Sequence, residues 1–256
     1  MKIKILGSGT ADGYPRITNN FSSKIDNSNS KNIRLRCSFY LQDNNDNLLV
    51  ECGPDIRYQT TKYNIKNFEN VFISHGHTDH MIGIWELEEF VGLYKKNLKI
   101  YGNEQTINII KERFPWMFDD VETENGSIIL KTIKPLEKVK INNFEILPMN
   151  FKHGNYFSSM GFRYKNFAFS PDLNEIPQEN DKYLQNLDLW LLECNDLEYD
   201  SKYGHTYLQQ ALNFIEKYKP QNAILTHIGA TIDYDKISKI LPNNVKLAYD
   251  GMEIEI

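Results

Sequence analysis

The sequence is poor in cysteine and has no long apolar run. Its 256 residues include three cysteines, Cys37, Cys52 and Cys194, which lie far apart and form no C-x-x-C pair. Such spacing does not indicate a disulfide framework. No stretch approaches the roughly 18 consecutive apolar residues of a membrane span, and the N-terminus carries no apolar signal segment. We therefore expect a cytoplasmic protein with no membrane partner.

The chain also lacks an excess of positive charge. Its 29 lysines and arginines are outnumbered by 34 acidic residues, so the net charge is −5. A protein that binds nucleic acid without regard to sequence needs a broad basic face. We therefore expect no large nucleic-acid surface, although a local phosphate site stays open. No repeat or linker is visible, and we expect a single domain over residues 1–256.

Apolar and alternating runs predict two strand-rich halves with helices between them. The segment 81–95 has helical spacing, with Ile84, Leu87, Phe90, Val91 and Tyr94 on one face. Two such halves predict an α/β protein in which two sheets pack together with helices outside. The predicted strands are 2–6, 35–42, 47–52, 70–75, 127–133, 138–141, 144–151, 160–165, 167–170, 187–193 and 222–227, with closing strands after them, and the further helices are 207–218 and a short one near 233–241.

One segment is compositionally biased. Residues 17–32 are rich in asparagine and serine. Few apolar side chains in a long connection leave little to bury, which predicts a mobile loop.

All six histidines lie at the ends of predicted elements. Three of them occur within H-G-H-T-D-H at residues 75–80, directly after a predicted strand. Buried imidazoles compete for hydrogen-bond partners, so a cluster of this kind indicates a metal site. Imidazole and carboxylate donors suit zinc, manganese or iron. The candidate ligands are His75, His77, Asp79, His80, His153, Asp172 and His227.

The motif H-G-H-T-D-H, followed in order by His153, Asp172 and His227, resembles the H-x-H-x-D-H signature of the metallo-β-lactamase superfamily of hydrolases. The resemblance runs from the G-S-G-T turn at 7–10 to the D-G-M-E-I ending at 250–254. It is nearest to the phosphodiesterase branch that includes the phosphoribosyl 1,2-cyclic phosphate enzyme. It implies an αββα sandwich of two mixed sheets and a dinuclear site for two divalent ions, zinc or manganese, with iron as a further option.

The resemblance also assigns roles to residues. It implies that His75, His77 and His153 hold one ion, that Asp79, His80 and His227 hold the second, and that Asp172 bridges them. Two ions about 3.5–4 Å apart activate a shared water and stabilise the attacking and leaving oxygens at phosphorus. Asp79 thus counts as catalytic as well as metal-binding.

Four further positions carry expectations. His205, which the metals do not need, is expected to bind the substrate and act as general acid for the leaving alkoxide. Arg34 and Arg36 could bind a phosphate bidentately, or alternate as one solvated face of a strand. Glu51 stands where the superfamily usually has aspartate and is expected to orient ligands. Similar enzymes often bind a structural zinc through cysteines near residues 17–30, and we expect no such site here because this stretch has none.

The sequence and the resemblance therefore predict a metal-dependent phosphodiesterase for a small, possibly cyclic, phosphodiester substrate. We also expect a homodimer. A tRNA 3′-end-type nuclease normally carries a basic arm, and none is visible. A thiolester hydrolase of the glyoxalase II kind usually adds a C-terminal helical region, whereas this chain ends in strands. A non-catalytic protein that binds a nucleotide or sugar phosphate would have no need of all seven ligands.

Overall fold

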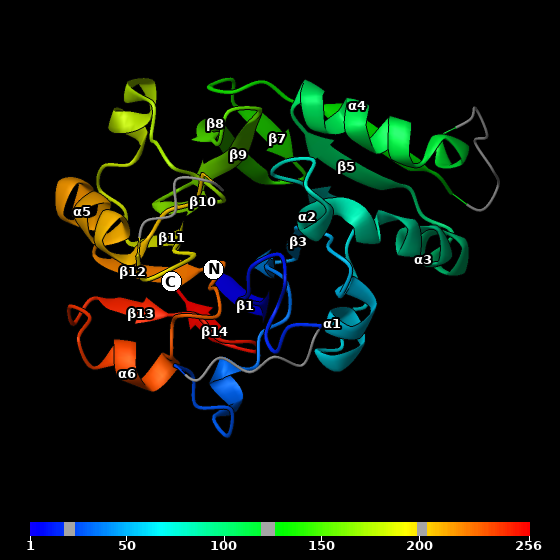
Figure 1. Ribbon diagram of the computed structural model, residues 1–256. Helices are drawn as coiled ribbons and strands as arrows, with labels where there is room; N and C mark the ends of the chain where they lie inside the picture. Colours follow the sequence, from blue (N-terminus) through cyan, green and yellow to red (C-terminus); the bar gives the residue numbers. More distant parts are fainter. Residues whose placement is uncertain (18–23, 119–125, 199–203) are drawn as a thin grey trace.

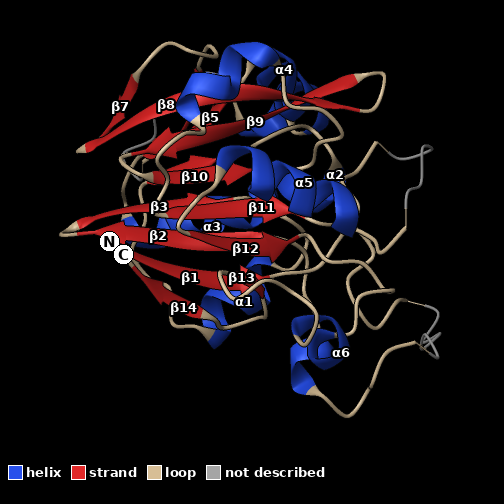
Figure 2. Ribbon diagram, turned by 90° about the vertical axis from the view of Figure 1, so that its left-hand side faces the viewer, coloured by secondary structure: helices blue, strands red, loops and turns tan. Residues whose placement is uncertain are grey.

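Two seven-stranded mixed sheets pack face to face, with helices on the outside (Figures 1 and 2). The computed structural model describes residues 1–17, 24–118, 126–198 and 204–256. The predicted αββα sandwich is confirmed. No helix within these described ranges is long and apolar enough to cross a membrane.

The first sheet has the strand order β14-β1-β2-β3-β4-β5-β6. It is antiparallel from β14 to β3 and parallel from β3 to β6. Its outer face is covered by α1, α3 and α4, whose apolar side chains pack on the sheet. The strands are β1 (Lys2–Gly7), β2 (Ser38–Asp43), β3 (Asp46–Val50), β4 (Asn70–Phe72), β5 (Leu98–Gly102), β6 (Ile128–Thr132) and β14 (Glu253–Glu255), and the helices are α1 (Ile56–Lys62), α2 (Thr78–Met81), α3 (Leu87–Tyr94) and α4 (Glu104–Arg113).

The second sheet has the order β13-β12-β11-β10-β9-β8-β7. It is parallel from β13 to β10 and antiparallel from β10 to β7. Helices α5 and α6 pack on its outer face, and α5 lies in front of the central strands in Figure 2. The elements are β7 (Val139–Ile141), β8 (Phe144–His153), β9 (Phe157–Tyr164), β10 (Phe167–Ser170), β11 (Leu189–Glu193), β12 (Asn222–Thr226), β13 (Val245–Leu247), α5 (Leu208–Tyr218) and α6 (Tyr234–Ser238).

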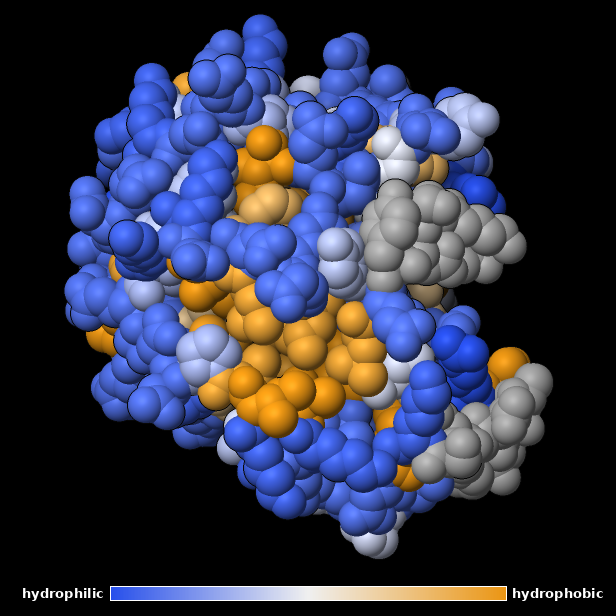
Figure 3. Space-filling model, turned by 60° about the vertical axis from the view of Figure 1, so that its left-hand side comes forward, coloured by the Kyte–Doolittle hydropathy of each residue, from blue (hydrophilic) through white to orange (hydrophobic). Residues whose placement is uncertain are grey.

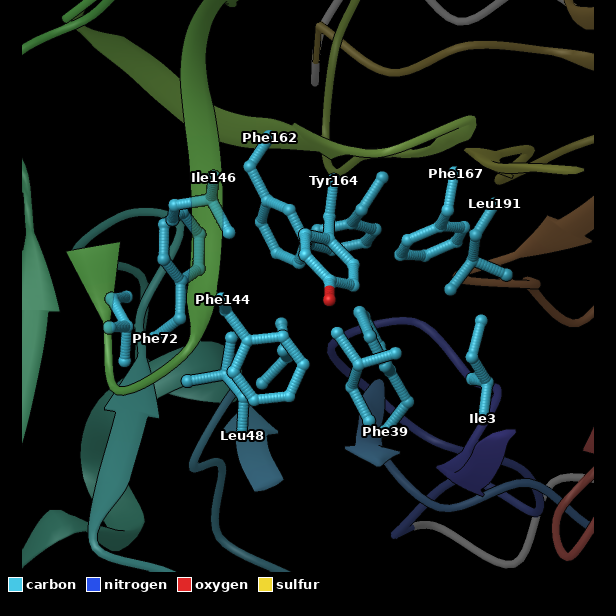
Figure 4. Close-up of a cluster of buried hydrophobic side chains, with 14 of the residues drawn as sticks. Ile3, Phe39, Leu48, Phe72, Phe144, Ile146, Phe162, Tyr164, Phe167 and Leu191 are labelled. Atoms are coloured by element: carbon cyan, nitrogen blue, oxygen red, sulfur yellow. The ribbon is translucent and has the colours of Figure 1, made fainter. Parts of the chain in front are cut away.

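Aromatic side chains fill the space between the two sheets (Figure 4). Phe39 of β2 meets Phe169 of β10 edge to face, with ring centroids 4.9 Å apart. Phe72 of β4 meets Phe162 of β9 in the same way at 5.0 Å. Edge-to-face pairs add specific geometry to the burial of apolar area. They fix the two sheets relative to each other and hence the positions of their strand ends.

The predicted helix at 81–95 is helical but interrupted. Residues Ile82–Glu86 form a 3₁₀ segment between α2 and α3. Gly83 donates to the Cys52 carbonyl at 2.9 Å, and a side chain there would stand 2.1 Å from the Gly53 carbonyl oxygen. This close backbone approach draws the segment out of regular α-helical geometry. Tyr94 is 45% exposed but lies against Phe90, with ring centroids 4.7 Å apart, so it is at the rim of the predicted face.

In the Asn/Ser-rich segment, residues 24–32 make specific contacts, whereas residues 18–23 lie outside the described residues, and the mobility of the segment stays a prediction. Ile25 is buried against Tyr14 and Ala230. The Asp233 carboxylate accepts hydrogen bonds from the Asp26 backbone N–H at 2.7 Å and from Asn32 Nδ2 at 3.0 Å. Polar contacts hold this part of the segment where apolar side chains are scarce.

The outer surface is mixed in character. The face shown in Figure 3 is largely hydrophilic, with a large apolar area near its centre and smaller ones elsewhere. Areas of this kind mark contact sites when they are large. The homodimer stays a prediction.

Asp250 joins the two ends of the chain. Its Oδ1 accepts hydrogen bonds from the Ser8 backbone N–H at 2.9 Å and from Ser8 Oγ at 2.8 Å. Its Oδ2 accepts from the Leu35 N–H at 2.8 Å. One carboxylate thereby connects the G-S-G-T turn, the segment before β2 and the D-G-M-E-I ending.

We predict that Asp250→Ala lowers the free energy of unfolding by about 2 kcal/mol or more, because three donors lose their acceptor. Asp250→Asn keeps one acceptor oxygen, so its free energy of unfolding should lie between those of the wild type and Asp250→Ala. Denaturant unfolding measures both, with Asp12→Ala as control, since Asp12 is an exposed partner of Arg16. Equal stability of Asp250→Ala and Asp12→Ala would contradict the role of this carboxylate.

Candidate metal centre

Strand ends from both sheets converge on one cluster of ionisable side chains. In the parallel parts of the sheets, the carboxyl ends of the strands meet at a common edge, where loops carry functional residues. All six histidines of the chain belong to the cluster or contact it. The contributing positions are Glu51 after β3, His75 after β4, His153 at the end of β8, Asp172 after β10, Glu193 at the end of β11 and His227 after β12.

The segment after β4 is shaped by close contacts. Ser74 Oγ is hydrogen-bonded to His75 Nδ1 at 2.9 Å, which leaves Nε2 of that ring for the cluster. A side chain at Gly76 would stand 2.5 Å from Ile109 of α4, so only glycine allows this approach. Helix α2 then begins and places Asp79 and His80, both buried, on the same side.

Four side chains form a first group of possible ligands: His75, His77, His153 and Asp172. His77 Nδ1 lies 2.9 Å from His75 Nε2 and 3.2 Å from His153 Nε2. Asp172 Oδ2 lies 3.8 Å from Nε2 of both His75 and His153. Three imidazole nitrogens and one carboxylate oxygen thus face a common point.

A second group shares Asp172 and adds Asp79, His80 and His227. His80 Nε2 lies 3.0 Å from Asp79 Oδ2 and 3.4 Å from Asp172 Oδ2. His227 Nε2 lies 3.3 Å from Asp79 Oδ2 and 3.4 Å from Asp172 Oδ1. The two oxygens of Asp172 therefore serve different neighbours, which is the geometry a bridging carboxylate needs.

The hydrogen bonding of the cluster is incomplete without a cation. Within the described residues, Asp172 Oδ1, Glu51 Oε1 and both ring nitrogens of His80 are buried and make no hydrogen bond. Buried polar atoms without partners are costly and rare. Divalent cations satisfy such atoms, and nitrogen and oxygen donors suit zinc, manganese or iron. The residues present therefore fit the metals that the resemblance implies.

The charge of the cluster also fits the binding of divalent metals. Four buried carboxylates, from Glu51, Asp79, Asp172 and Glu193, surround the histidines. Two divalent ions would bring four positive charges and balance them with every imidazole neutral.

In the metal-free protein, protons on the histidines neutralise part of the negative charge of these carboxylates. Burial lowers the pKa of His80, but Asp79, Asp172 and Glu51 outweigh it and raise that pKa well above its usual range. Burial opposes a similar effect at His227, where the charge of Asp172 and hydrogen bonds that His227 donates to Asp79 and Glu193 raise the pKa to about 10. The second group therefore holds protons that a metal must displace.

The first group differs in this respect. Burial and the neighbouring His153 lower the pKa of His77 to about 4. Burial and the charge of His80 likewise lower the pKa of His75 well below its usual range. These imidazoles are neutral at pH 7 and need lose no proton to bind a metal.

Two of these residues have left-handed backbone conformations. Glu51 has φ of 66° and His227 has φ of 57°. This region is disfavoured for residues with a Cβ, and such strain persists where surrounding contacts hold it. At Glu51 the contacts include Ser74 N–H, which donates to Oε2 at 3.3 Å, and His80 Nδ1, 3.4 Å from Oε1. The predicted place of Glu51 beside a ligand histidine matches the structure.

Glu193 is a site residue that the sequence analysis missed. It ends β11, is fully buried and is hydrogen-bonded through Oε1 to His205 Nδ1. Burial lowers the pKa of His205, but the Glu193 charge and hydrogen bond outweigh it, so the pKa is raised. An acidic residue at the end of the apolar run L-D-L-W-L-L-E was the available signal. The structure places His205 beside both groups, with Nδ1 3.7 Å from Asp172 Oδ2.

Arg34 does not fit its predicted role in substrate binding. Its side chain is 1% exposed and donates hydrogen bonds to the Ile232 carbonyl at 2.7 Å and to Asn32 Oδ1 at 3.0 Å. A buried guanidinium bound to protein oxygens stabilises the fold and cannot reach a dissolved phosphate. Arg36 is partly exposed but pairs with Asp55 at 3.2 Å, and its phosphate-binding role stays a prediction.

The family assignment follows from comparison with known proteins. A family model described as the β-lactamase superfamily domain matches residues 46–228. The chain belongs to the β-lactamase superfamily. The resemblance inferred from the H-x-H-x-D-H motif is thereby confirmed, and this superfamily consists largely of hydrolases.

Individual relatives are more distant. The octanoyltransferase of Porphyromonas gingivalis is 25% identical over 99% of this chain, which spans about half (51%) of that protein. The ribonuclease Z of Methanocaldococcus jannaschii is 27% identical over 60% of this chain and 44% of its own length. A crystal structure described as a new diphosphatase from the PhnP family covers 100% of this chain and 97% of its own, with a TM-score of 0.90 and 24% identity. That likeness shows a shared fold.

We predict that the protein binds two divalent ions per chain and that the second binds more weakly as the pH falls. His75 and His77 are free of protons at pH 6, whereas His80 and His227 hold theirs. Affinity for the second ion should therefore rise by about tenfold per pH unit for each proton displaced. Calorimetric zinc titrations of metal-free protein at pH 6 and pH 8 measure this. Two ions of unchanged affinity at both pH values would contradict it.

Glu51→Gln should weaken the second ion by about 10–100-fold, because Glu51 orients His80. Glu69→Gln is the matched control, since Glu69 is an exposed partner of Lys96. Equal metal affinities in the two variants would show that Glu51 does not support the ligands.

Proposed function

We propose that this superfamily member is a dinuclear-metal-dependent phosphodiesterase acting on a small, possibly cyclic, phosphodiester. The observation that carries the proposal is the shared Asp172. It belongs to all three four-residue groups whose ligand atoms lie within 4.8 Å of one another, and two of these are the proposed metal groups. A paired site of this kind suits in-line displacement at phosphorus, where the attacking and leaving oxygens both need stabilisation.

The roles of the chain's residues follow from the geometry. When bound, two divalent ions supply activated water near neutral pH and polarise the phosphoryl oxygens. His75, His77 and His153 would hold one of them, and Asp79, His80 and His227 the other. Asp172 would contribute to both sites. Phe157 packs against the His77 ring, with centroids 4.3 Å apart, and helps to hold that ring in place.

His205 is the proposed general acid. Glu193 occupies its Nδ1 and is itself held by the Thr206 backbone N–H at 3.3 Å. The other ring nitrogen, Nε2, is therefore the one that can give a proton to the leaving alkoxide. The raised pKa of His205 keeps the ring protonated near neutral pH. Because Glu193 and His205 satisfy each other, they are better suited to this role than to holding a third ion.

The rival functions are weaker for physical reasons. A relative named ribonuclease Z supports phosphodiester chemistry, but the net charge of −5 does not favour binding of a long RNA. Thiolester hydrolysis needs no donor for an alkoxide, which leaves the Glu193–His205 pair without a purpose. A non-catalytic protein needs neither the pair nor the bridging carboxylate.

A substrate panel tests the proposal. Protein loaded with zinc, manganese or iron should hydrolyse bis-p-nitrophenyl phosphate and at least one of a 2′,3′-cyclic nucleotide, a 3′,5′-cyclic nucleotide and a cyclic phosphoribose. Thiolester substrates and a tRNA precursor serve as comparisons. Hydrolysis of a thiolester or of tRNA alone, or turnover of nothing while both ions are bound, would overturn the proposal.

We predict that His205→Ala lowers kcat by about 10²–10⁴-fold on a substrate with a poor alkoxide leaving group. The loss should be much smaller with a p-nitrophenolate leaving group, which departs without a proton. Metal content, measured by mass spectrometry, should stay at two ions per chain. Equal losses on both substrates would exclude proton donation.

Glu193→Gln should reproduce part of this pattern. Glutamine keeps the size of the side chain but removes the charge that raises the pKa of His205. The pKa seen in the pH profile of kcat on the alkoxide substrate should therefore move to lower pH, with a smaller change for p-nitrophenolate. An unmoved profile would reduce Glu193 to a structural residue.

A further inference from the structure

The turn between β8 and β9 carries an exposed aromatic ring beside the metal centre. Residues 154–156 connect the strands, and the flanking residues His153 and Phe157 are paired in register. His153 is a proposed ligand, and Phe157 packs on the His77 ring. Between them, Tyr156 is 85% exposed, the highest value among the aromatic residues of the described surface.

The backbone of this turn is fixed by its neighbours. Gln105 Nε2 of α4 donates to the Tyr156 carbonyl at 3.1 Å. Asn174 Oδ1 accepts from the Gly154 N–H at 2.9 Å. A side chain at Gly204 would stand 2.3 Å from the Gly154 nitrogen, so Gly204, directly before His205, packs on the turn. A ring on a fixed backbone has only its own torsions to order when a ligand binds.

Folding does not account for Tyr156. An exposed ring buries little area and contributes little to stability. A tyrosine does offer a flat apolar face at low entropic cost, which suits recognition of another planar group. The charged side chains near Tyr156 indicate whether that planar group belongs to a small ligand or to a long nucleic acid. Lys152 is paired with Glu175 at 2.9 Å, so this lysine does not extend a phosphate track of the kind that single-stranded nucleic acids require.

We propose that Tyr156 is a stacking platform for one nucleobase, so that the phosphodiester substrate is a mononucleotide derivative. The inference rests on the proposed function and narrows it to a substrate class. Base and phosphate are then recognised separately, the base at the β8–β9 turn and the phosphate at the strand ends.

A matched pair of substrates tests this proposal. p-Nitrophenyl thymidine 5′-phosphate and methyl p-nitrophenyl phosphate have the same leaving group, but only the first carries a base. Tyr156→Ala should lower the ratio of their kcat/KM values by about five- to tenfold, mostly through KM, in line with the loss of one base–aromatic contact. Tyr156→Phe should keep the ratio, and so should Tyr58→Ala, which removes an exposed tyrosine from α1.

A binding measurement separates this inference from the proposed function. Calorimetry on metal-loaded protein should give tighter binding of AMP than of ribose 5-phosphate, and Tyr156→Ala should remove that difference. If the wild type hydrolyses neither ester but keeps this preference, the phosphodiesterase proposal fails and the base site stands. Equal binding of the two ligands by the wild type, or a ratio of kcat/KM unchanged in Tyr156→Ala, overturns the base site.

Discussion

Buried carboxylates are concentrated at the strand ends, and the protonation and metal binding of the whole site depend on their negative charge. Four carboxylates lie within reach of all six histidines, in a place where isolated charges are costly. Protons on His80 and His227 offset part of this charge, and two divalent ions would offset all of it. Against the effect of burial, Glu193 raises the pKa of His205, and the neighbouring histidines lower the pKa values of Asp79 and Asp172, so the carboxylates and imidazoles of the cluster stabilise one another's charged forms.

The fold can hold these charged side chains close together because its packed sheets form a rigid scaffold around them. Edge-to-face pairs such as Phe39 with Phe169 hold the sheets together, and strand ends from both sheets then meet without further adjustment. Where the path of the chain is unfavourable, local contacts keep it in place. Glu51 and His227 stay in left-handed conformations, and Gly83 lets the segment after α2 lie against the end of β3. Left-handed residues also occur elsewhere in the chain, but at Glu51 and His227 the conformation belongs to residues of the cluster, where function can set the geometry.

A site residue could be predicted from the sequence when the pattern that marks it lies within a short stretch of the chain. His75, His77 and His80 could be read together because three of the ligands lie within six residues, and the order of the remaining pieces identified the superfamily. Glu193 carried no such signal, since an acidic residue at the end of a strand reads the same whether it is buried or solvated. For Arg34 the sequence left open a phosphate-binding role and a solvated face, because alternation along a strand cannot say which face is covered. One of its real partners, the Ile232 carbonyl, is about 200 residues away in the chain, and such a contact is visible only after folding.

The third group of the cluster explains why one histidine acts differently from the other five. Asp172, Glu193, His205 and His227 lie as close together as the members of the other two groups, so proximity alone does not define a metal ligand. One difference lies in which atoms are already satisfied. Glu193 takes His205 Nδ1 as a hydrogen-bond partner, whereas His80 has no hydrogen bond on either nitrogen. The other proposed ligand histidines are also hydrogen-bonded, so hydrogen bonding alone does not separate ligands from the proposed acid. What distinguishes His205 is its pairing with the buried Glu193 carboxylate, and our proposal of acid catalysis rests on that pairing.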